Sequence, residues 1–264
     1  MSMAITILGC GSSGGVPRVG GDWGACDRTN PKNRRRRCSI LVERTKGEGR
    51  TVALVDTSPD LREQLLAAEV TRLDGILMTH AHADHTHGID DVRPLVISMR
   101  KRIEMFMDDP TAEDLRTKFA YVFETPAGSQ YPPLLDVRHL TPGHACAIDG
   151  PGGKIEAMPF RLEHGEVDAL GFRFGDVAYT PDLNAVPRES WTFLEGLDIW
   201  IVDALRYMRH PSHLSLSETL ELIRQLKPRR AIVTNLHTDL DFERLRQELP
   251  HNVEPAYDGM RIEF

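Results

Sequence analysis

The sequence predicts an α/β or α+β fold with two β-sheets inside one domain. Short apolar runs closed by Gly, Asp or Pro gather into an N-terminal and a C-terminal set of predicted strands, and helical patterns follow each set. The segment 124–153 between the sets is dense in Pro and Gly but keeps apolar residues, so we interpret it as a joint between two halves. Residues 1–264 are therefore expected to form a single domain, long enough to bury a large core.

The predicted strands are β-branched or alternating runs. They cover residues 4–8, 38–43, 51–56, 74–79, 154–162, 169–174, 176–180, 198–203 and 230–235. Two predicted helices have recognisable start signals, because Ser58 precedes Pro59, and Glu218 follows Ser215 by three residues in a capping box. The predicted helices cover residues 59–68, 90–99, 112–121, 187–195, 215–226 and 241–248.

The composition is that of an ordinary soluble protein, with 41% hydrophobic and 27% charged residues. The net charge of −7 argues against wrapping by nucleic acid and against attraction to a membrane surface. The apolar runs are too short to span a bilayer, and the first residues show no secretion signal. Four cysteines without a C-x-x-C pair predict reduced thiols and a cytoplasmic location.

The first predicted strand ends in a glycine-rich turn, Gly9-Cys10-Gly11-Ser12-Ser13-Gly14, which matches the G-x-G-x-x-G pattern. A dinucleotide site would need a helix to begin at this turn, and the Pro and Gly residues of 17–31 leave no room for one. Two interpretations stay open. Gly11, Ser12 and Ser13 contact a substrate phosphate through the turn, or the turn serves only to leave a buried strand.

The densest group of metal-binding residue types is the segment Thr79-His80-Ala81-His82-Ala83-Asp84-His85, which directly follows a predicted buried strand. In an extended turn, His80 and His82 point to the same side and can hold one cation. Asp84 and His85 can hold a second. Imidazole and carboxylate ligands suit Zn²⁺, Mn²⁺ or Fe²⁺.

This segment resembles the signature of the metallo-β-lactamase superfamily, and the resemblance extends over nearly the whole chain. It implies a four-layer αββα sandwich with the metals at one edge, and a structural role for Asp56 beside the ligands. It also implies two divalent cations, zinc or manganese. The first would be held by His80, His82 and His164, and the second by Asp84, His85 and His237, with Asp182 between them.

The flanking segments "GCGSSGGVP", "DTSPDLR" and "YTPD" resemble one branch of the superfamily. That branch contains phosphoribosyl 1,2-cyclic phosphate phosphodiesterase, and its neighbours are transfer RNA 3′-processing endonucleases and a pyrroloquinoline quinone biosynthesis protein. The resemblance implies hydrolysis of a small ribosyl cyclic phosphate or nucleotide-like ester by a metal-bridging hydroxide, with Asp84 in the catalytic centre. It makes His213 the candidate general acid and His210 a weaker candidate. Alternatively, His213 only precedes a helix.

Several expectations concern the substrate and partners. The run Arg34–Arg37 is either a lip that attracts phosphate, with Arg37 contacting it, or a solvated turn. The loop after the first strand keeps only Cys26 where the phosphodiesterase has a zinc-binding cysteine cluster, so no third metal is expected. We expect a small substrate, no membrane and no large nucleic acid; a homodimer is compatible with the sequence. The alternatives are hydrolysis of a carboxylic ester, lactone or thioester, and a non-catalytic carrier.

Overall fold

The computed structural model describes residues 2–264, which form two seven-stranded sheets. The first sheet has the strand order β14-β1-β2-β3-β4-β5-β6. Its strands are β1 (Ser2–Gly9), β2 (Ser39–Lys46), β3 (Gly49–Val55), β4 (Gly75–Leu77), β5 (Ile103–Met107), β6 (Leu135–His139) and β14 (Arg261–Glu263). The strands from β3 to β6 are parallel neighbours, so their carboxyl ends meet at one edge of the molecule.

The second sheet has the order β13-β12-β11-β10-β9-β8-β7. Its strands are β7 (Cys146–Ile148), β8 (Ile155–His164), β9 (Val167–Phe174), β10 (Val177–Thr180), β11 (Ile199–Asp203), β12 (Arg230–Thr234) and β13 (Val253–Pro255). Here the strands from β10 to β13 are parallel. The two halves therefore repeat one plan, an antiparallel set of strands followed by a parallel set.

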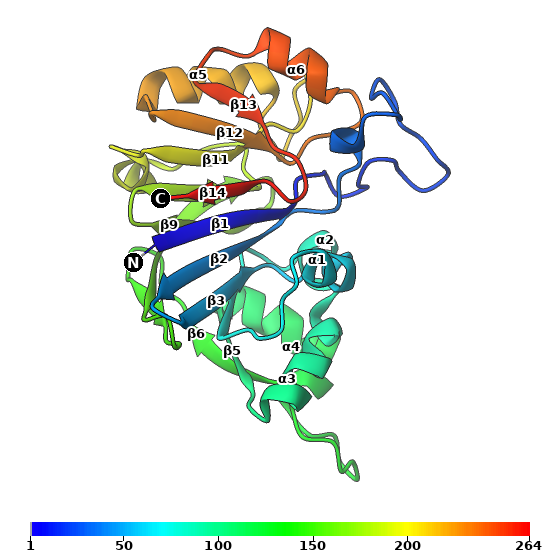
Figure 1. Cartoon of the computed structure of the whole chain (residues 1–264), viewed down its shortest axis with the longest axis vertical. Helices are drawn as coiled ribbons and strands as arrows, with labels where there is room; N and C mark the ends of the chain where they lie inside the picture. Colours follow the sequence, from blue (N-terminus) through cyan, green and yellow to red (C-terminus); the bar gives the residue numbers. More distant parts are fainter. Residues whose placement is uncertain (1) are drawn as a thin grey trace.

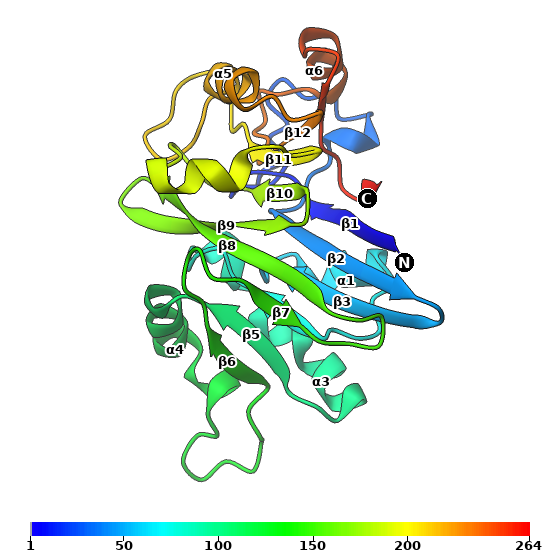
Figure 2. The same ribbon diagram turned by 90° about the vertical axis from the view of Figure 1, so that its left-hand side faces the viewer.

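The helices cover the outer faces of the sheets, as Figure 1 shows with α5 and α6 at one end and α1, α3 and α4 at the other. The α-helices are α1 (Leu61–Ala67), α2 (Ala83–Thr86), α3 (Arg93–Met99), α4 (Asp109–Phe123), α5 (Leu216–Leu226) and α6 (Phe242–Glu248). Short 3₁₀ helices are η1 (Pro31–Asn33), η2 (Ile89–Val92) and η3 (Arg188–Leu194). The predicted αββα sandwich is confirmed. Figure 2 shows the two sheets from the side of β7 and β8.

Three apolar clusters hold these layers together. The central cluster lies between the sheets, where Ile5, Ile40 and Phe172 are fully buried. One outer cluster packs the first sheet against α1, α3 and α4, and the other packs the second sheet against α5 and α6. Most strands are thus buried on both faces. This explains why they are almost continuous apolar runs in the sequence.

Each of the nine predicted strands coincides with an observed one, but five further strands were missed. Of these, β7, β13 and β14 have only three residues each, which is too short for a periodic signal. The joint 124–153 contains β6 of the first sheet and β7 of the second, so the chain crosses between the sheets there.

The helix predictions need two corrections. The first helix begins at Leu61, after Asp60, rather than at Pro59; the Ser58 hydroxyl accepts from the Asp60 amide at 3.2 Å and donates to the Gln64 side chain at 2.8 Å. The predicted helix 187–195 is the 3₁₀ helix η3. No helix among residues 2–264 combines the length and apolarity needed to cross a membrane.

Candidate metal centre

The predicted ligands come from turns that follow strands of both sheets at one edge of the sandwich. His80 and His85 follow β4, His164 ends β8, and Asp182 follows β10. In Figure 1, α2, which carries His85, lies at this edge beneath the blue loop that follows β1. Because the ends of the parallel strands converge here, residues far apart in the sequence meet in one cluster.

The rings of His80, His82 and His164 form the first group of side chains that could hold a metal ion. The Nδ1 atom of His82 lies 2.9 Å from Nε2 of His80 and 3.2 Å from Nε2 of His164. Nδ1 of His80 lies 3.0 Å from the Thr79 hydroxyl, and Nδ1 of His164 lies 2.7 Å from the Ser212 carbonyl oxygen. A carbonyl oxygen only accepts, so the His164 proton is on Nδ1 and its Nε2 lone pair faces the group.

The electrostatics of this group favour neutral imidazoles. Burial and the charge of His85 lower the pKa of His80 well below its usual value, and burial also lowers the pKa of His164. Nε2 of His80 and Nε2 of His164 both face Nδ1 of His82, so three ring nitrogens converge on one point. A cation at their common point satisfies all three, so these residues fit a divalent metal.

The second group consists of His80, His85 and Asp182. Nε2 of His85 lies 3.2 Å from Oδ1 of Asp182 and 3.6 Å from Oδ2 of Asp84. Burial alone would lower the pKa of His85, but the charges of Asp182, Asp56 and Asp84 outweigh burial and raise it well above its usual value. Carboxylates in these positions stabilise a positive charge, which a metal ion would supply when the imidazole is neutral.

Asp182 links the groups. Its Oδ2 lies 3.7 Å from Nε2 of His164, and its Oδ1 lies 3.2 Å from Nε2 of His85. Burial tends to raise the pKa of Asp182, but the charge of His85 holds it well below its usual range. An ionised, buried carboxylate whose two oxygens face ligand candidates of both groups is suited to bridging two cations.

Asp56 supports the cluster from behind. It is fully buried with φ 65°, in the left-handed region, and it accepts hydrogen bonds from Thr79 N (2.8 Å), Thr79 Oγ1 (2.8 Å) and His85 Nδ1 (2.7 Å). The bond to His85 directs the opposite ring nitrogen toward Asp182. Asp56 thus occupies the structural place that the resemblance implied.

His213 lies beside the cluster and forms a third group with His164 and Asp182. Its Nδ1 is 2.9 Å from Oδ2 of Asp203, the last residue of β11, and 3.2 Å from Nδ2 of Asn235. Burial alone would lower the pKa of His213, but the hydrogen bond and charge of Asp203 raise it to about 9. Burial raises the pKa of Asp203 to about 7, although its bond with His213 acts in the opposite direction.

The structure does not bring His237 into any of the three groups formed by residues 2–264. Nε2 of His237 contacts the Arg18 guanidinium, and its Nδ1 lies 3.1 Å from Oδ1 of Asp239. Asn235, with φ 62°, instead directs its amide to His213. His237 is therefore not among the clustered side chains, and its assignment to the second metal stays a prediction. Asp84 lies beside the second group, with its Oδ2 3.6 Å from Nε2 of His85.

The glycine-rich turn is used for close backbone packing. A Cβ on Gly9 would lie 2.0 Å from the Arg37 carbonyl oxygen, and one on Gly11 would lie 2.9 Å from Arg35 Cβ. The Gly11 amide donates to Arg36 O at 2.7 Å, and the Ser12 amide donates to Leu236 O at 3.3 Å. Neither of these two amides is therefore free for a phosphate, whereas the buried Ser12 hydroxyl has no hydrogen-bond partner among the described residues, so a phosphate contact at this turn stays a prediction. Ser13 is exposed.

Within the arginine run, Arg35 and Arg37 have partners among the described residues and Arg34 is exposed, so contact of Arg37 with a phosphate stays a prediction. Arg37 pairs with Asp60 at 3.1 Å, which compensates its charge. Arg35 is buried and donates to the carbonyl oxygens of Leu240 at 2.7 Å and His237 at 3.2 Å. Cys26 lies on the same guanidinium, with Sγ 3.8 Å from Nη1 of Arg35. Arg35 therefore fastens the loop to the segment after β12.

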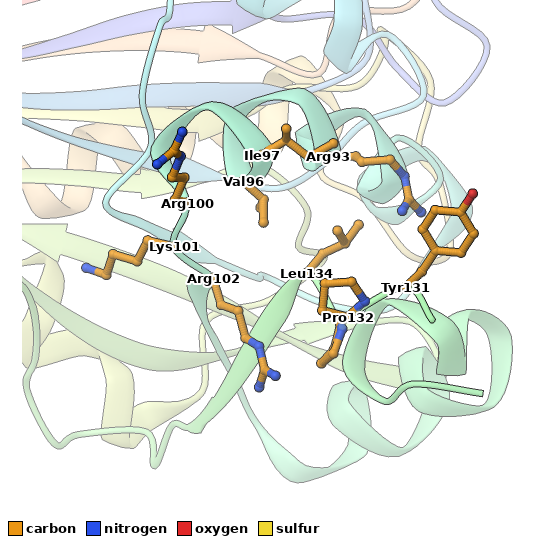
Figure 3. Close-up of a pocket in the computed structure, with 10 residues that line it drawn as sticks. Arg93, Val96, Ile97, Arg100, Lys101, Arg102, Tyr131, Pro132 and Leu134 are labelled. Atoms are coloured by element: carbon orange, nitrogen blue, oxygen red, sulfur yellow. The ribbon is translucent and has the colours of Figure 1, made fainter. Parts of the chain in front are cut away.

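Two hollows help to place the centre on the surface. A cavity of about 470 Å³ is lined by His80 and His82 together with Asp114, Lys118 and Glu166. Figure 3 shows another, of about 360 Å³, along α3, where basic side chains such as Arg100 surround an apolar floor. None of the predicted site residues lines the second hollow, so we regard the first as the entrance to the metal centre.

The comparison with protein families shows which family the chain belongs to. The model of the beta-lactamase superfamily domain matches residues 51–235, which include four of the clustered residues after β4 and both His164 and Asp182. The chain belongs to the beta-lactamase superfamily. With its cluster of histidines and aspartates, this superfamily member is a metal-dependent hydrolase.

Individual relatives are consistent with this membership. The octanoyltransferase of Porphyromonas gingivalis is 30% identical over 263 residues, covering 98% of this chain but only 51% of that protein. A crystal structure of a diphosphatase from the PhnP family has 33% identity and a TM-score of 0.89, over 100% of this chain and 98% of that one. Human tRNase Z, short form, has 17% identity and a TM-score of 0.61, over 98% of both chains, which shows a shared fold.

Some residues of the centre were missed from the sequence. Asp203 ends a predicted strand in the run "DIWIVD", and an aspartate at the end of a buried strand is a signal that could have found it. Asn235 ends the next predicted strand and offered the same signal. Arg18 and Arg35 lie in an irregular loop, where spacing carries no information about contacts.

Proposed function

We propose that this protein is a dinuclear metal-dependent phosphodiesterase that acts on a small ribosyl cyclic phosphate or nucleotide-like ester. The observation that carries the proposal is the His213–Asp203 pair beside the ligand cluster, at 2.9 Å. A protonated imidazole adjacent to a metal cluster suits a reaction whose leaving group departs as an alkoxide and needs a proton. The PhnP-family diphosphatase, at 33% identity, supports a phosphate substrate.

His213 would act as the general acid. Because Asp203 accepts from Nδ1, the Nε2–H of a protonated His213 is available for the leaving oxygen. His210, whose ring centroid lies 5.1 Å from that of His213, is less suited, because burial and the charge of His213 lower its pKa. A histidine that is neutral near pH 7 cannot supply this proton.

The cation-binding residues would be His80, His82 and His164 for one ion, and His85 and Asp84 for the other, with Asp182 between them. Two divalent cations, zinc or manganese, would lower the pKa of bound water and hold the phosphoryl oxygens. Asp56 keeps His85 oriented through its 2.7 Å bond with Nδ1. Thr79 and the Ser212 carbonyl do the same for His80 and His164.

Acyl substrates are the second candidate, because one relative is named an octanoyltransferase. A metal cluster of this kind also supports attack on a carboxylic ester, lactone or thioester. An alkoxide or thiolate leaving group with a low pKa departs without needing a proton, so its release would depend less on His213. Dependence on His213 therefore helps to separate the candidates.

The test is a substrate panel on protein loaded with Zn²⁺ or Mn²⁺. Bis(p-nitrophenyl) phosphate, a ribose cyclic phosphate and a nucleoside diphosphate are compared with a lactone and an octanoyl thioester. We expect turnover of the phosphate compounds and a fall in kcat of about 10²–10⁴-fold in H213Q on substrates with poor leaving groups. H210Q is the matched control and should change kcat little.

Turnover restricted to the lactone or thioester would overturn the proposed phosphodiesterase. Protein that holds two metal equivalents and hydrolyses no member of either panel would favour a non-catalytic carrier. An equal loss of kcat in H210Q and H213Q would show that His213 has no special role in proton transfer.

A further inference from the structure

The contacts of His237 define a chain of three side chains at the rim of the metal centre. Its Nε2 contacts the Arg18 guanidinium, and its Nδ1 lies 3.1 Å from Oδ1 of Asp239. Because arginine can only donate, Nε2 must accept, and the imidazole proton is therefore on Nδ1, facing the carboxylate. Asp239 is held in turn by the Tyr207 amide, which donates to Oδ2 at 3.2 Å.

The charge of Arg18 is not compensated within the described part of the chain. No carboxylate among residues 2–264 pairs with it, in contrast to Arg37, which pairs with Asp60. The side chain lies along the glycine-rich turn, where a Cβ built on Gly14 would meet Arg18 Cγ at 3.2 Å. A guanidinium without a carboxylate partner keeps its full positive charge for an incoming anion.

A second observation at this turn also points to a ligand. Ser12 is only 3% exposed, and its hydroxyl has no hydrogen-bond partner among the described residues. Its amide donates to the carbonyl oxygen of Leu236, the residue before His237, so the hydroxyl belongs to the same corner of the molecule. Buried hydroxyls without a hydrogen-bond partner in the protein are uncommon unless a water or a ligand supplies that hydrogen bond.

A continuous series of contacts links this corner to the metal centre. Nδ1 of His213 lies 3.8 Å from Oδ2 of Asp182, and the His210 ring centroid lies 5.1 Å from that of His213. Asn235, two residues before His237, has its Nδ2 3.2 Å from Nδ1 of His213. Arg18 contacts His237 and belongs to none of the three ligand groups, which suits it to a second group of the substrate rather than to the bond that is cleaved.

We propose that Arg18 binds a second, non-reacting phosphate of the substrate, and that His237 and Asp239 are positioning residues for Arg18 rather than metal-binding residues. This inference rests on the proposed function. It names a substrate class, phosphate compounds with two phosphate groups, and replaces the role assigned to His237 from the sequence.

The test compares KM with kcat and measures bound metal. In R18Q, we expect KM for a nucleoside diphosphate to rise about 10–100-fold, the effect of losing a charge-assisted hydrogen bond, with kcat little changed. KM for bis(p-nitrophenyl) phosphate, which has one phosphate, should stay the same. H237L should reproduce R18Q, while H237Q, whose amide oxygen can accept from Arg18, should restore most of the affinity.

R28Q is the matched control, because Arg28 is an exposed arginine of the same loop. H237L should retain the metal equivalents of the wild-type protein by elemental analysis. Loss of one metal equivalent in H237L would overturn the positioning role. An equal rise of KM for both substrates in R18Q, or the same rise in R28Q, would overturn the second-phosphate site.

Binding of inorganic pyrophosphate, followed by calorimetry, separates this inference from the proposed function. If the wild-type protein hydrolyses no phosphate compound, tighter pyrophosphate binding to wild type than to R18Q still supports the anion site. Equal binding to both proteins overturns it, whatever the enzyme hydrolyses.

Discussion

The turn after β4 and the turn after β12 leave buried parallel strands at the same edge of the sandwich, yet they carry different chemistry. After β4, His80 and His85 lie in the ligand cluster. After β12, Asn235 faces His213, while His237 contacts Arg18 and Asp239. The turn after β4 supplies side chains of the candidate metal site. The turn after β12 supplies side chains that contact His213, Arg18 and Asp239 instead.

The backbone explains this difference. In the first turn, His80 and His82 are two residues apart and their rings meet at one point, as alternation in an extended segment requires. In the second turn, Asn235 has φ 62°, in the left-handed region, so the alternation is broken there. Asn235 faces His213, whereas His237 contacts Arg18 and Asp239.

The largest expected effect tests the first turn. Replacing Asp182 by Asn removes the buried carboxylate charge between the two groups and leaves His85 without its 3.2 Å partner. We expect D182N to lose at least one metal equivalent and at least about 10³-fold of kcat. Elemental analysis and steady-state kinetics measure both. Full metal content in D182N would contradict the bridging role of this residue.

The next effect concerns proton transfer beside the second turn. His213 has a pKa of about 9 because of Asp203, and it can donate a proton only below that pKa. Activity should therefore be lost as pH rises through about 9. In D203N the raising charge is absent, so the alkaline limb of the kcat profile should move to lower pH, with about a tenfold loss or more at pH 8.

A pH–rate profile of wild type, D203N and H210Q tests this expectation. H210Q should keep the wild-type alkaline limb, because His210 has no carboxylate partner that raises its pKa. An unchanged alkaline limb in D203N would assign the titration to a group other than His213.

The smallest expected effect on activity concerns the loop that carries Arg18. Arg35 is 2% exposed and bonds two carbonyl oxygens of the segment after β12. In R35M these oxygens lose a charged donor, which should lower the free energy of unfolding by about 2–3 kcal/mol. Thermal unfolding measures the change, and R28M is the exposed control. Activity of the folded protein should change least for substrates with one phosphate. A melting temperature equal to wild type would show that Arg35 does not fasten the loop.

Local patterns were enough for most of the architecture. The long strands β1, β2, β3, β8 and β9 are apolar runs whose signal depends only on their own residues. The capping box at Ser215 also predicted the start of α5, where the Ser215 hydroxyl accepts from the Glu218 amide at 3.4 Å and the Glu218 carboxylate accepts from the Ser215 amide at 3.0 Å. The three-residue strands β7, β13 and β14 were missed because they are stabilised by their neighbours in the sheet, whereas β4, equally short, lies in the longer predicted run 74–79.

The sequence by itself determined the cation-binding segment 80–85, because four metal-binding side chains within six residues interact through local geometry alone. It could not determine that Asp203 lies beside His213, or that His237 contacts Arg18. Those pairings join residues of different strands and loops, and their energies depend on burial and charge that exist only after the sheets have packed. Only the tertiary structure decided them.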